Sequence, residues 1–249
     1  MTIAITFDLW DTVFHDDSDE PKRAAAGLPT KKVSRRDLVH AALLAHGDLD
    51  RALVDAAYDT ADAAFNQVWN QQSVTWSVAE RLGVMLKGLG RSLPDAEFAD
   101  LVAAHEEMEV LIQPDLAPGI VQALRELHGR YPLGVISDTV FSPGSSLRRI
   151  LAGHDLLRCF DSLVFSDEAG WSKPAPALFA RAAEGLGVPV TRLVHIGDRE
   201  SKDVAGPLRV GARAILTTVV KDRRTGPTAA AATCTNYADL VAIIDSLAG

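Results

Sequence analysis

Six residues with reactive side chains end or follow short apolar runs that lie far apart in the sequence. They are Asp8, Ser137, Asp138, Lys173, Asp198 and Asp203. A carboxylate can attack phosphorus to form an aspartyl phosphate, which divides one difficult displacement into two easier ones. Two neighbouring carboxylates can hold Mg²⁺, a hard cation that prefers oxygen ligands and neutralises phosphate charge. A serine hydroxyl can donate to a phosphoryl oxygen and a lysine can balance its negative charge, so this set favours phosphoryl transfer.

The apolar runs before these residues have the length of strands, and helical patterns lie between them. Strands are predicted at 3–7, 132–137, 161–166, 192–197 and 212–217, and helices at 119–130, 143–151, 176–186 and 201–210. Such alternation implies a parallel sheet with helices on both faces, which is an α/β fold with a doubly wound, Rossmann-like core. Right-handed crossovers bring the carboxyl ends of the strands to one edge, where the reactive residues can share a pocket.

A long insertion interrupts this alternation after the first strand. More than 100 residues separate the first two predicted strands, which is too many for one crossover helix. Helical periodicity and few strand formers are found at 35–46, 48–72, 77–89 and 94–111, and the flanks HDDSDEP and QPDLAPG are turn-like. We therefore expect an all-helical domain at residues 15–113 and a core domain made of residues 1–14 and 114–249.

Four motifs in this order resemble the haloacid dehalogenase superfamily, and the resemblance covers essentially the whole chain. FDLWDT is similar to the nucleophile motif, VISDT to the hydroxyl motif, SKPAP to the lysine motif and GDRESKD to the acidic metal motif. The helical insertion lies where this family places its cap. The resemblance implies Mg²⁺-dependent hydrolysis of a small phosphorylated metabolite through an aspartyl phosphate, under a cap that closes over the strand ends and selects the substrate.

The resemblance also implies a function for each motif residue. Asp8 would be the nucleophile and a metal ligand, and Asp198 would be the main metal ligand of the acidic motif. Asp203 would support the metal site, by orienting Lys173 or a metal-bound water. Ser137 would bind the transferred phosphoryl group, and Lys173 would stabilise it.

Three more residues of the first two motifs are expected at the site. Thr12 matches the threonine that closes the nucleophile motif, and Trp10 has the position whose backbone carbonyl contacts the metal in the family. The Trp10 side chain would either line the pocket and pack on the substrate or fill the base of the cap. Asp138, beside Ser137, is counted as substrate-binding, although an aspartate there is more often a turn or cap residue.

The family resemblance fails at one important position. Phosphatases of the family have an aspartate two residues after the nucleophile, where it protonates the leaving group and activates water, and this chain has Trp10. Asp11 is one place further on, and its side chain would point to the opposite face of an extended chain. His15 follows closely after the motif. Whether Asp11, His15 or no residue replaces the missing acid stays open at this stage.

Three other functions are compatible with parts of the pattern. Carbon–halogen cleavage occurs in relatives with a bulky aromatic residue at the Trp10 position, but without a metal, and the clustered acids of GDRESKD would repel one another without a cation. Carbon–phosphorus cleavage would need an imine-forming lysine in the cap, and Lys31 and Lys32 are candidates that we expect to be exposed. A protein that binds a phosphorylated ligand with little catalysis is the third alternative.

The remaining features of the sequence concern partners and location. Asp and Glu number 33 and Lys and Arg 25, which argues against a nucleic-acid-binding surface. No apolar run approaches the ~20 residues that span a bilayer, and the N-terminus lacks a signal-peptide pattern. Cys159 and Cys234 have neither disulfide nor metal-ligand spacing, so we expect packing cysteines in a cytoplasmic protein. No particular oligomeric state is predicted.

The basic run KKVSRR, residues 31–36, has two interpretations. A charge run is usually a solvated helix face, and this is the expectation here. The alternative is a clamp for a substrate anion that reaches over the pocket.

Overall fold

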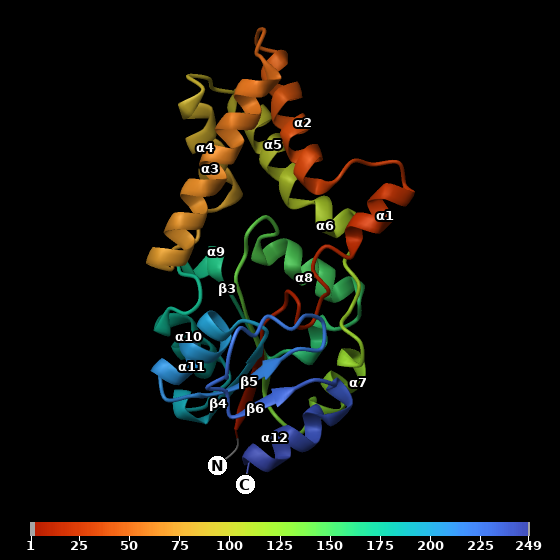
Figure 1. Ribbon diagram of the computed structural model, residues 1–249, viewed down its shortest axis with the longest axis vertical. Helices are drawn as coiled ribbons and strands as arrows, with labels where there is room; N and C mark the ends of the chain where they lie inside the picture. Colours follow the sequence, from red (N-terminus) through yellow and green to blue (C-terminus); the bar gives the residue numbers. More distant parts are fainter. Residues whose placement is uncertain (1–2, 249) are drawn as a thin grey trace.

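A six-stranded parallel sheet lies in the lower part of the computed structural model as drawn in Figure 1, and the structure describes residues 3–248. The strands are β1 (Ala4–Phe7), β2 (Leu133–Ser137), β3 (Ser162–Phe165), β4 (Leu193–Gly197), β5 (Arg213–Thr217) and β6 (Ala232–Cys234). The five strands that the sequence predicts are all present. The sequence pattern does not predict β6, because a strand of three residues is too short to show a periodicity.

The strand order, β3-β2-β1-β4-β5-β6, shows that the chain builds outward from β1 in both directions. Phe7 at the end of β1 pairs with Val135 of β2 and Ile196 of β4. The backbone N–H of Asp8 then donates to the carbonyl of Ile196 at 2.8 Å. Asp8 and Asp198 therefore leave neighbouring strands on the two sides of the point where the strand order reverses, which is where such sheets bind ligands.

Helices cover both faces of the sheet, as expected for a doubly wound fold. Alternate residues of the central strands face opposite sides: Phe7 and Val135 pack with α7, α8 and α12, whereas Ala4 and Ile136 pack with α10. The longer core helices are α7 (Ile120–Leu127), α8 (Gly144–Gly153), α10 (Pro176–Gly185) and α12 (Leu240–Ala248), and α11 (Ala205–Arg209) is a single short turn. The short ones are η1 (Leu157–Cys159), α9 (Ser166–Ala169), η2 (Val190–Arg192), η3 (Glu200–Val204) and η4 (Tyr237–Asp239). The predicted fold class is confirmed.

Six helices lie between β1 and α7 in the sequence, and α2 to α5 form a group beyond one end of the sheet (Figure 1). They are α1 (Asp19–Ala25), α2 (Lys31–Leu44), α3 (Arg51–Gln72), α4 (Val78–Gly88), α5 (Asp95–Glu106) and α6 (Met108–Leu111). We call α1 to α6 the helical insert. It has an apolar cluster of its own, which includes Val39, Tyr58, Leu82 and Leu101. The insert is all-helical, and the domain limits at residues 15 and 113 stay a prediction.

The start of the insert differs from the sequence-based expectation. The segment HDDSDEP is not only a turn, because α1 begins within it at Asp19. The next helix, α2, begins at Lys31, four residues before the expected start. Thr30 explains this, because its hydroxyl accepts from the backbone N–H of Val33 at 3.3 Å and caps the first turn. The basic run therefore lies inside a helix.

The expectation of a solvated face for this basic run is wrong. Lys31, Arg35 and Arg36 are buried, and only the other members of the run reach solvent. Acidic side chains from other helices accept hydrogen bonds from two of them: Asp19 and Glu109 pair with Lys31, and Asp59 pairs with Arg36. A charged side chain can be buried when such partners replace water, and a sequence pattern does not show them.

Two simpler expectations concern the cysteines and the membrane. Cys159 and Cys234 are free thiols buried in the core, so both are packing residues. Among residues 3–248, no helix combines the length and the apolar character needed to cross a membrane.

Candidate active site

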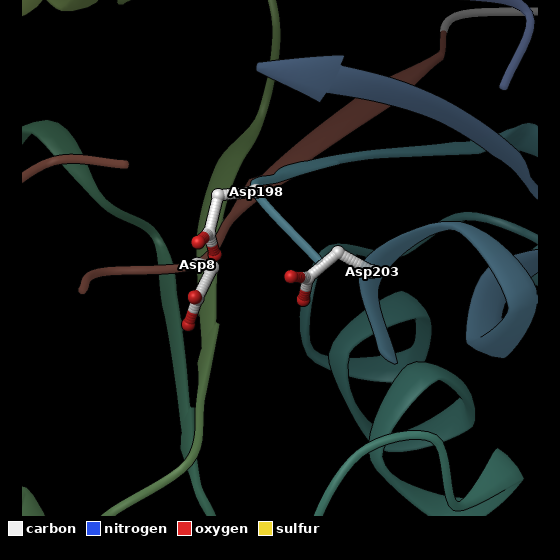
Figure 2. Close-up of side chains that lie close together, drawn as sticks. All are labelled: Asp8, Asp198 and Asp203. Atoms are coloured by element: carbon white, nitrogen blue, oxygen red, sulfur yellow. The ribbon is translucent and has the colours of Figure 1, made fainter. Parts of the chain in front are cut away.

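Three buried carboxylates meet at the carboxyl edge of the sheet. Asp8 follows β1, Asp198 follows β4, and Asp203 comes from the π-helical turn η3 (Figure 2). One oxygen from each of the three lies within 4.8 Å of the others. Elements more than 180 residues apart in the sequence therefore place three acids in one small volume, as the sequence motifs predict.

Lys173 lies between two of these carboxylates. Its Nζ is 2.8 Å from Oδ1 of Asp8 and 2.6 Å from Oδ1 of Asp203, and the residue is only 2% exposed. Burial by itself would lower the pKa of Lys173, but the negative charges of Asp203 and Asp8 outweigh it and raise the pKa above its ordinary value. The lysine is therefore a fixed positive charge beside Asp8.

Asp203 uses both of its carboxylate oxygens within the protein. Oδ1 accepts from Lys173 and from Nε2 of His195 at 3.2 Å, and Oδ2 accepts from the backbone N–H of Arg199 at 2.9 Å. Burial would raise the pKa of Asp203, but the charge of Lys173 and the hydrogen bonds lower it overall. Gly197 is required beneath this side chain, because a Cβ there would overlap the carboxyl group. Asp203 is thus a support for Lys173.

His195, which showed no ligand spacing in the sequence, supports Asp203. Burial lowers the pKa of His195, so its imidazole is neutral near pH 7. Nδ1 lies 2.9 Å from the hydroxyl of Thr6, and Nε2 faces the Asp203 carboxylate, which can only accept. The proton is therefore on Nε2, and Thr6 donates to Nδ1.

Asp198 is the acid with capacity left for a ligand. Its Oδ2 accepts from Nε of Arg223, whereas its buried Oδ1 has no hydrogen-bond partner among the described residues. Burial, with the charges of Asp8 and Asp203, raises the pKa of Asp198 to about 7. An unsatisfied buried carboxylate oxygen is costly, and a hard divalent cation would satisfy it. The donor set of this site therefore fits Mg²⁺, with Asp8 and Asp198 as the protein carboxylates that would hold it.

The three residues expected near the phosphoryl group and the substrate differ in placement. Asp138 Oδ1 accepts from the backbone N–H of Lys173 and Oδ2 from Nζ of Lys202, both at 2.8 Å, so this carboxylate positions the two lysines. Ser137 is buried at the end of β2, with Oγ 3.3 Å from the carbonyl of Asp138. Thr12 is buried too, and its carbonyl accepts from the hydroxyl of Tyr237 at 2.8 Å.

A cavity of about 260 Å³ opens beside Asp8, between the core and the helical insert. Trp10 lines it, so the interpretation of Trp10 as a pocket residue agrees with the structure; its ring also packs edge-on against Phe14, with centroids 5.7 Å apart. Ser137 and Thr12 are not among the lining residues. Charged and aromatic groups that line the cavity include Asp8, Asp16, Lys31, Arg35, Trp69, Glu109, Asp138, Phe141, Lys173 and Lys202.

Asp16 is one of three acids in this cavity that the sequence motifs did not predict, together with Asp17 and Glu109. Burial, together with the charges of Asp17 and Asp11, raises the pKa of Asp16 to about 6. The two residues that the sequence offered instead do not line the cavity: Asp11 pairs with Arg223, and His15 is exposed. The family motif ends before residue 16, so the only available signal was the acid-rich segment HDDSDE.

The assumption of an extended chain after Trp10 is also wrong. Asp11 has a φ of 54°, in the left-handed region, so the chain turns there. Its carboxylate accepts from the backbone N–H of Asp16 at 3.1 Å as well as from Arg223. The turn at Asp11 therefore fixes the segment that carries Asp16.

Lys31 lines the cavity and is only 4% exposed, which contradicts its expected exposure. Its Nζ lies 2.7 Å from Asp19 Oδ1 and 3.0 Å from Glu109 Oε1. Burial alone would lower the pKa of Lys31, but these carboxylates raise it above the ordinary value. An amine must be neutral to form an imine, so Lys31 is poorly suited to the carbon–phosphorus cleavage considered above.

The fold and the site define a hydrolase with a doubly wound core and a helical insert. Residues 4–211 match the family model described as haloacid dehalogenase-like hydrolase, and the chain belongs to this family. It is 34% identical over 121 residues to a glyceraldehyde 3-phosphate phosphatase from Methanopyrus kandleri, which is 47% of this chain and 49% of that protein. The chain thus spans about half the length of this relative.

Solved structures share the fold over the whole chain. A 2-haloacid dehalogenase from Pseudomonas syringae pv. tomato has a TM-score of 0.69 at 20% identity, with 100% of both chains covered. A putative hydrolase of the family from Bacillus subtilis, bound to magnesium, has a TM-score of 0.61 at 17% identity, with 98% of this chain and 99% of that chain covered. At such identities the likeness concerns the fold.

Proposed function

We propose that the protein hydrolyses a small phosphorylated metabolite in a Mg²⁺-dependent reaction, with Asp8 as the nucleophile. The observation that carries this proposal is the pairing of Asp8 with the protonated Lys173 at the wall of a cavity, beside the free oxygen of Asp198. The phosphatase named among the relatives acts on a small phosphate ester, which agrees with the proposal.

Two displacements would make up the reaction. An oxygen of Asp8 attacks phosphorus, the bond from phosphorus to the ester oxygen breaks, and the alcohol leaves with a proton. Water then attacks the phosphorus of the aspartyl phosphate and releases inorganic phosphate and the free carboxylate. Burial raises the pKa of Asp8, and the adjacent charge of Lys173 opposes this and favours the ionised nucleophile. Lys173 and the Ser137 hydroxyl would bind the phosphoryl oxygens.

The metal would be held by Asp8, Asp198 and the backbone carbonyl of Trp10, with Asp203 as a supporting acid. When bound, Mg²⁺ supplies positive charge that neutralises the phosphoryl group. Asp203 acts through its hydrogen bonds to Lys173 and to the backbone of Arg199. The helical insert would act as the cap, because residues from it and from the core line the same cavity.

Asp16 is the residue that we propose for the acid–base step that Trp10 cannot perform. It lines the same cavity as Asp8, and a pKa of about 6 leaves part of its population protonated near neutral pH. A general acid works best when its pKa lies near the working pH. Asp16 would therefore protonate the leaving alcohol and then accept a proton from the attacking water.

Carbon–halogen cleavage and simple binding of a phosphorylated ligand are the competing functions. Trp10 in the cavity favours carbon–halogen cleavage. The cluster of three acids, with an Asp198 oxygen that lacks a partner among the described residues, disfavours it, because that reaction uses no metal. A panel of phosphate monoesters and 2-haloacids, assayed with and without Mg²⁺, separates these functions. We expect phosphate release that needs Mg²⁺ and is lost in Asp8→Asn. Halide release that survives chelation would overturn the proposal, and metal-dependent binding without turnover would indicate a binding protein.

A further inference from the structure

The guanidinium of Arg35, on α2, is a buried cation with unused hydrogen-bond donors. The residue is 6% exposed, and its Nε and Nη2 have no hydrogen-bond partner among residues 3–248. Arg35 forms an ion pair with Glu109, but Nη2 of Arg35 is 3.8 Å from Oε1 of Glu109. This distance is too long for a hydrogen bond. Burial also lowers the pKa of Arg35, although an arginine stays protonated in a protein.

Glu109 is already engaged with other groups. Its Oε1 accepts from Nζ of Lys31 at 3.0 Å, and its Oε2 accepts from the hydroxyl of Ser142. Glu109 therefore cannot turn toward Arg35 without losing these hydrogen bonds.

The guanidinium is held in place by an aromatic ring. Its Cζ lies 3.5 Å from the centroid of Phe141, which is a cation–π contact. Arg81 also lies against Phe141, at 4.1 Å, and its own charge pairs with Asp62. Stacking fixes the position of Arg35 but uses none of its N–H groups, so the donors stay available for a carboxylate or a phosphate.

Arg35 lines the same cavity as Asp8. A second donor there lacks a partner among the described residues, the indole Nε1 of Trp69, and Trp69 also lines the cavity. Buried donors are rarely left unsatisfied in folded proteins, and each one needs an explanation. Both donors belong to the helical insert, opposite the carboxylates of the core, so an acceptor-rich ligand would satisfy them.

We infer that Arg35 and Trp69 form a subsite for a second oxyanion of the substrate, a carboxylate or a second phosphate. This inference rests on the proposed function, because it assumes that the reacting phosphoryl group lies at Asp8. The substrate class is then a small phosphate monoester that carries another anionic group on its alcohol part. The forked donors of Arg35 bind that group, and the indole N–H of Trp69 binds an acceptor beside it.

A matched set of esters tests this subsite. The set contains short carboxyalkyl phosphates, the corresponding alkyl bisphosphates and the corresponding carboxamides, which keep the size but lose the charge. We expect kcat/KM of the wild type to be about 10- to 100-fold higher for one of the anionic members than for its carboxamide, as for a hydrogen bond to a charged group. The preferred anionic member identifies the carboxylate or the phosphate as the natural group.

Variants on α2 locate the effect. In Arg35→Met the ratio between the anionic ester and the carboxamide should fall to about 1. Arg36→Met is the matched control, because Arg36 is a buried arginine on the same helix that pairs with Asp59, stacks on Tyr58 and does not line the cavity. It should keep the ratio of the wild type. Wild-type enzyme that turns over the anionic ester and the carboxamide equally well would overturn the inference, even if Arg35→Met does not fold.

A binding measurement separates this inference from the proposed function. If no ester is hydrolysed, the proposed function fails, and calorimetric titration with a carboxyalkyl phosphonate and its carboxamide then tests the subsite alone. Tighter binding of the carboxylate by about 10-fold or more, lost in Arg35→Met, supports the subsite. Equal binding of the two phosphonates refutes it.

Discussion

Replacement of Asp16 by asparagine is the most direct test of how the enzyme works without an acid at Trp10. The amide keeps the shape of the side chain but cannot donate a proton as a carboxylic acid does. A pKa of about 6 leaves roughly 9% of Asp16 protonated at pH 7, whereas the ordinary value of 3.8 would leave roughly 0.06%. The cavity thus raises the population of the acid form roughly 150-fold, and its loss should slow alkyl esters by about 10²–10⁴-fold.

The assay compares phosphate esters whose alcohols differ in pKa. Alkyl phosphates need a proton on the leaving oxygen, so Asp16→Asn should slow them strongly. Aryl phosphates with an acidic phenol need little help, so the same variant should affect formation of their phosphoenzyme much less. The rate ratio between wild type and variant should fall as the pH rises from 6 to 8, because Asp16 loses its proton over that range.

Asp17→Asn is the control for this experiment. Asp17 is the neighbouring acid, and its charge helps to raise the pKa of Asp16. Its removal should move the pH profile to lower pH while keeping the dependence on the leaving group. If Asp16→Asn slows alkyl and aryl esters by the same factor at every pH, Asp16 does not act as the acid, and the assignment is refuted.

Three further predictions follow from the site and from the helical insert. Asp198→Ala should weaken Mg²⁺ binding at least about 10-fold in a calorimetric titration, because it removes the free carboxylate oxygen, and unchanged affinity would exclude Asp198 as a ligand. Trp10→Asp, introduced into Asp16→Asn, should recover part of the lost alkyl-ester hydrolysis, because the new acid lies two residues after Asp8 in the cavity wall; no recovery at intact folding would argue against a missing proton donor. Burial lowers the pKa of His105 to about 4, so the unfolded chain takes up a proton there at higher pH than the folded protein. The free energy of unfolding should therefore fall by up to about 3 kcal/mol between pH 6.5 and pH 4, and His105→Phe, compared with wild type by denaturant titration at each pH, should remove that part of the decrease.

Much of the fold follows from local sequence patterns. The strands β1, β2 and β4 are mostly apolar runs because both of their faces are covered, and such runs are visible without any knowledge of tertiary contacts. The helices α2 to α5 of the insert are visible for the same reason, since their periodicity is local, whereas α1 begins in a segment that the sequence predicts as a turn. The π-helical turn η3 is an exception, because the segment predicted as one helix at 201–210 is divided there.

The sequence by itself also determined which side chains gather at the edge of the sheet. Asp8, Lys173 and Asp198 lie at or beyond strand ends, and in a parallel sheet all these ends are on one side. Their approach to one another is therefore a consequence of topology, and motif spacing was enough to predict it.

Only the tertiary structure decided how the cavity opposite these residues is built. The charge of Lys31 can be buried because Asp19 and Glu109 accept hydrogen bonds from its ammonium group. Glu109 lies 78 residues from Lys31 in the sequence. Arg35 is buried against Phe141, which follows β2. The left-handed turn at Asp11 fixes the segment of Asp16, whose pKa depends on its burial in the folded chain. A sequence pattern records the local preference of each segment, whereas the burial of a charge depends on partners that only folding brings near.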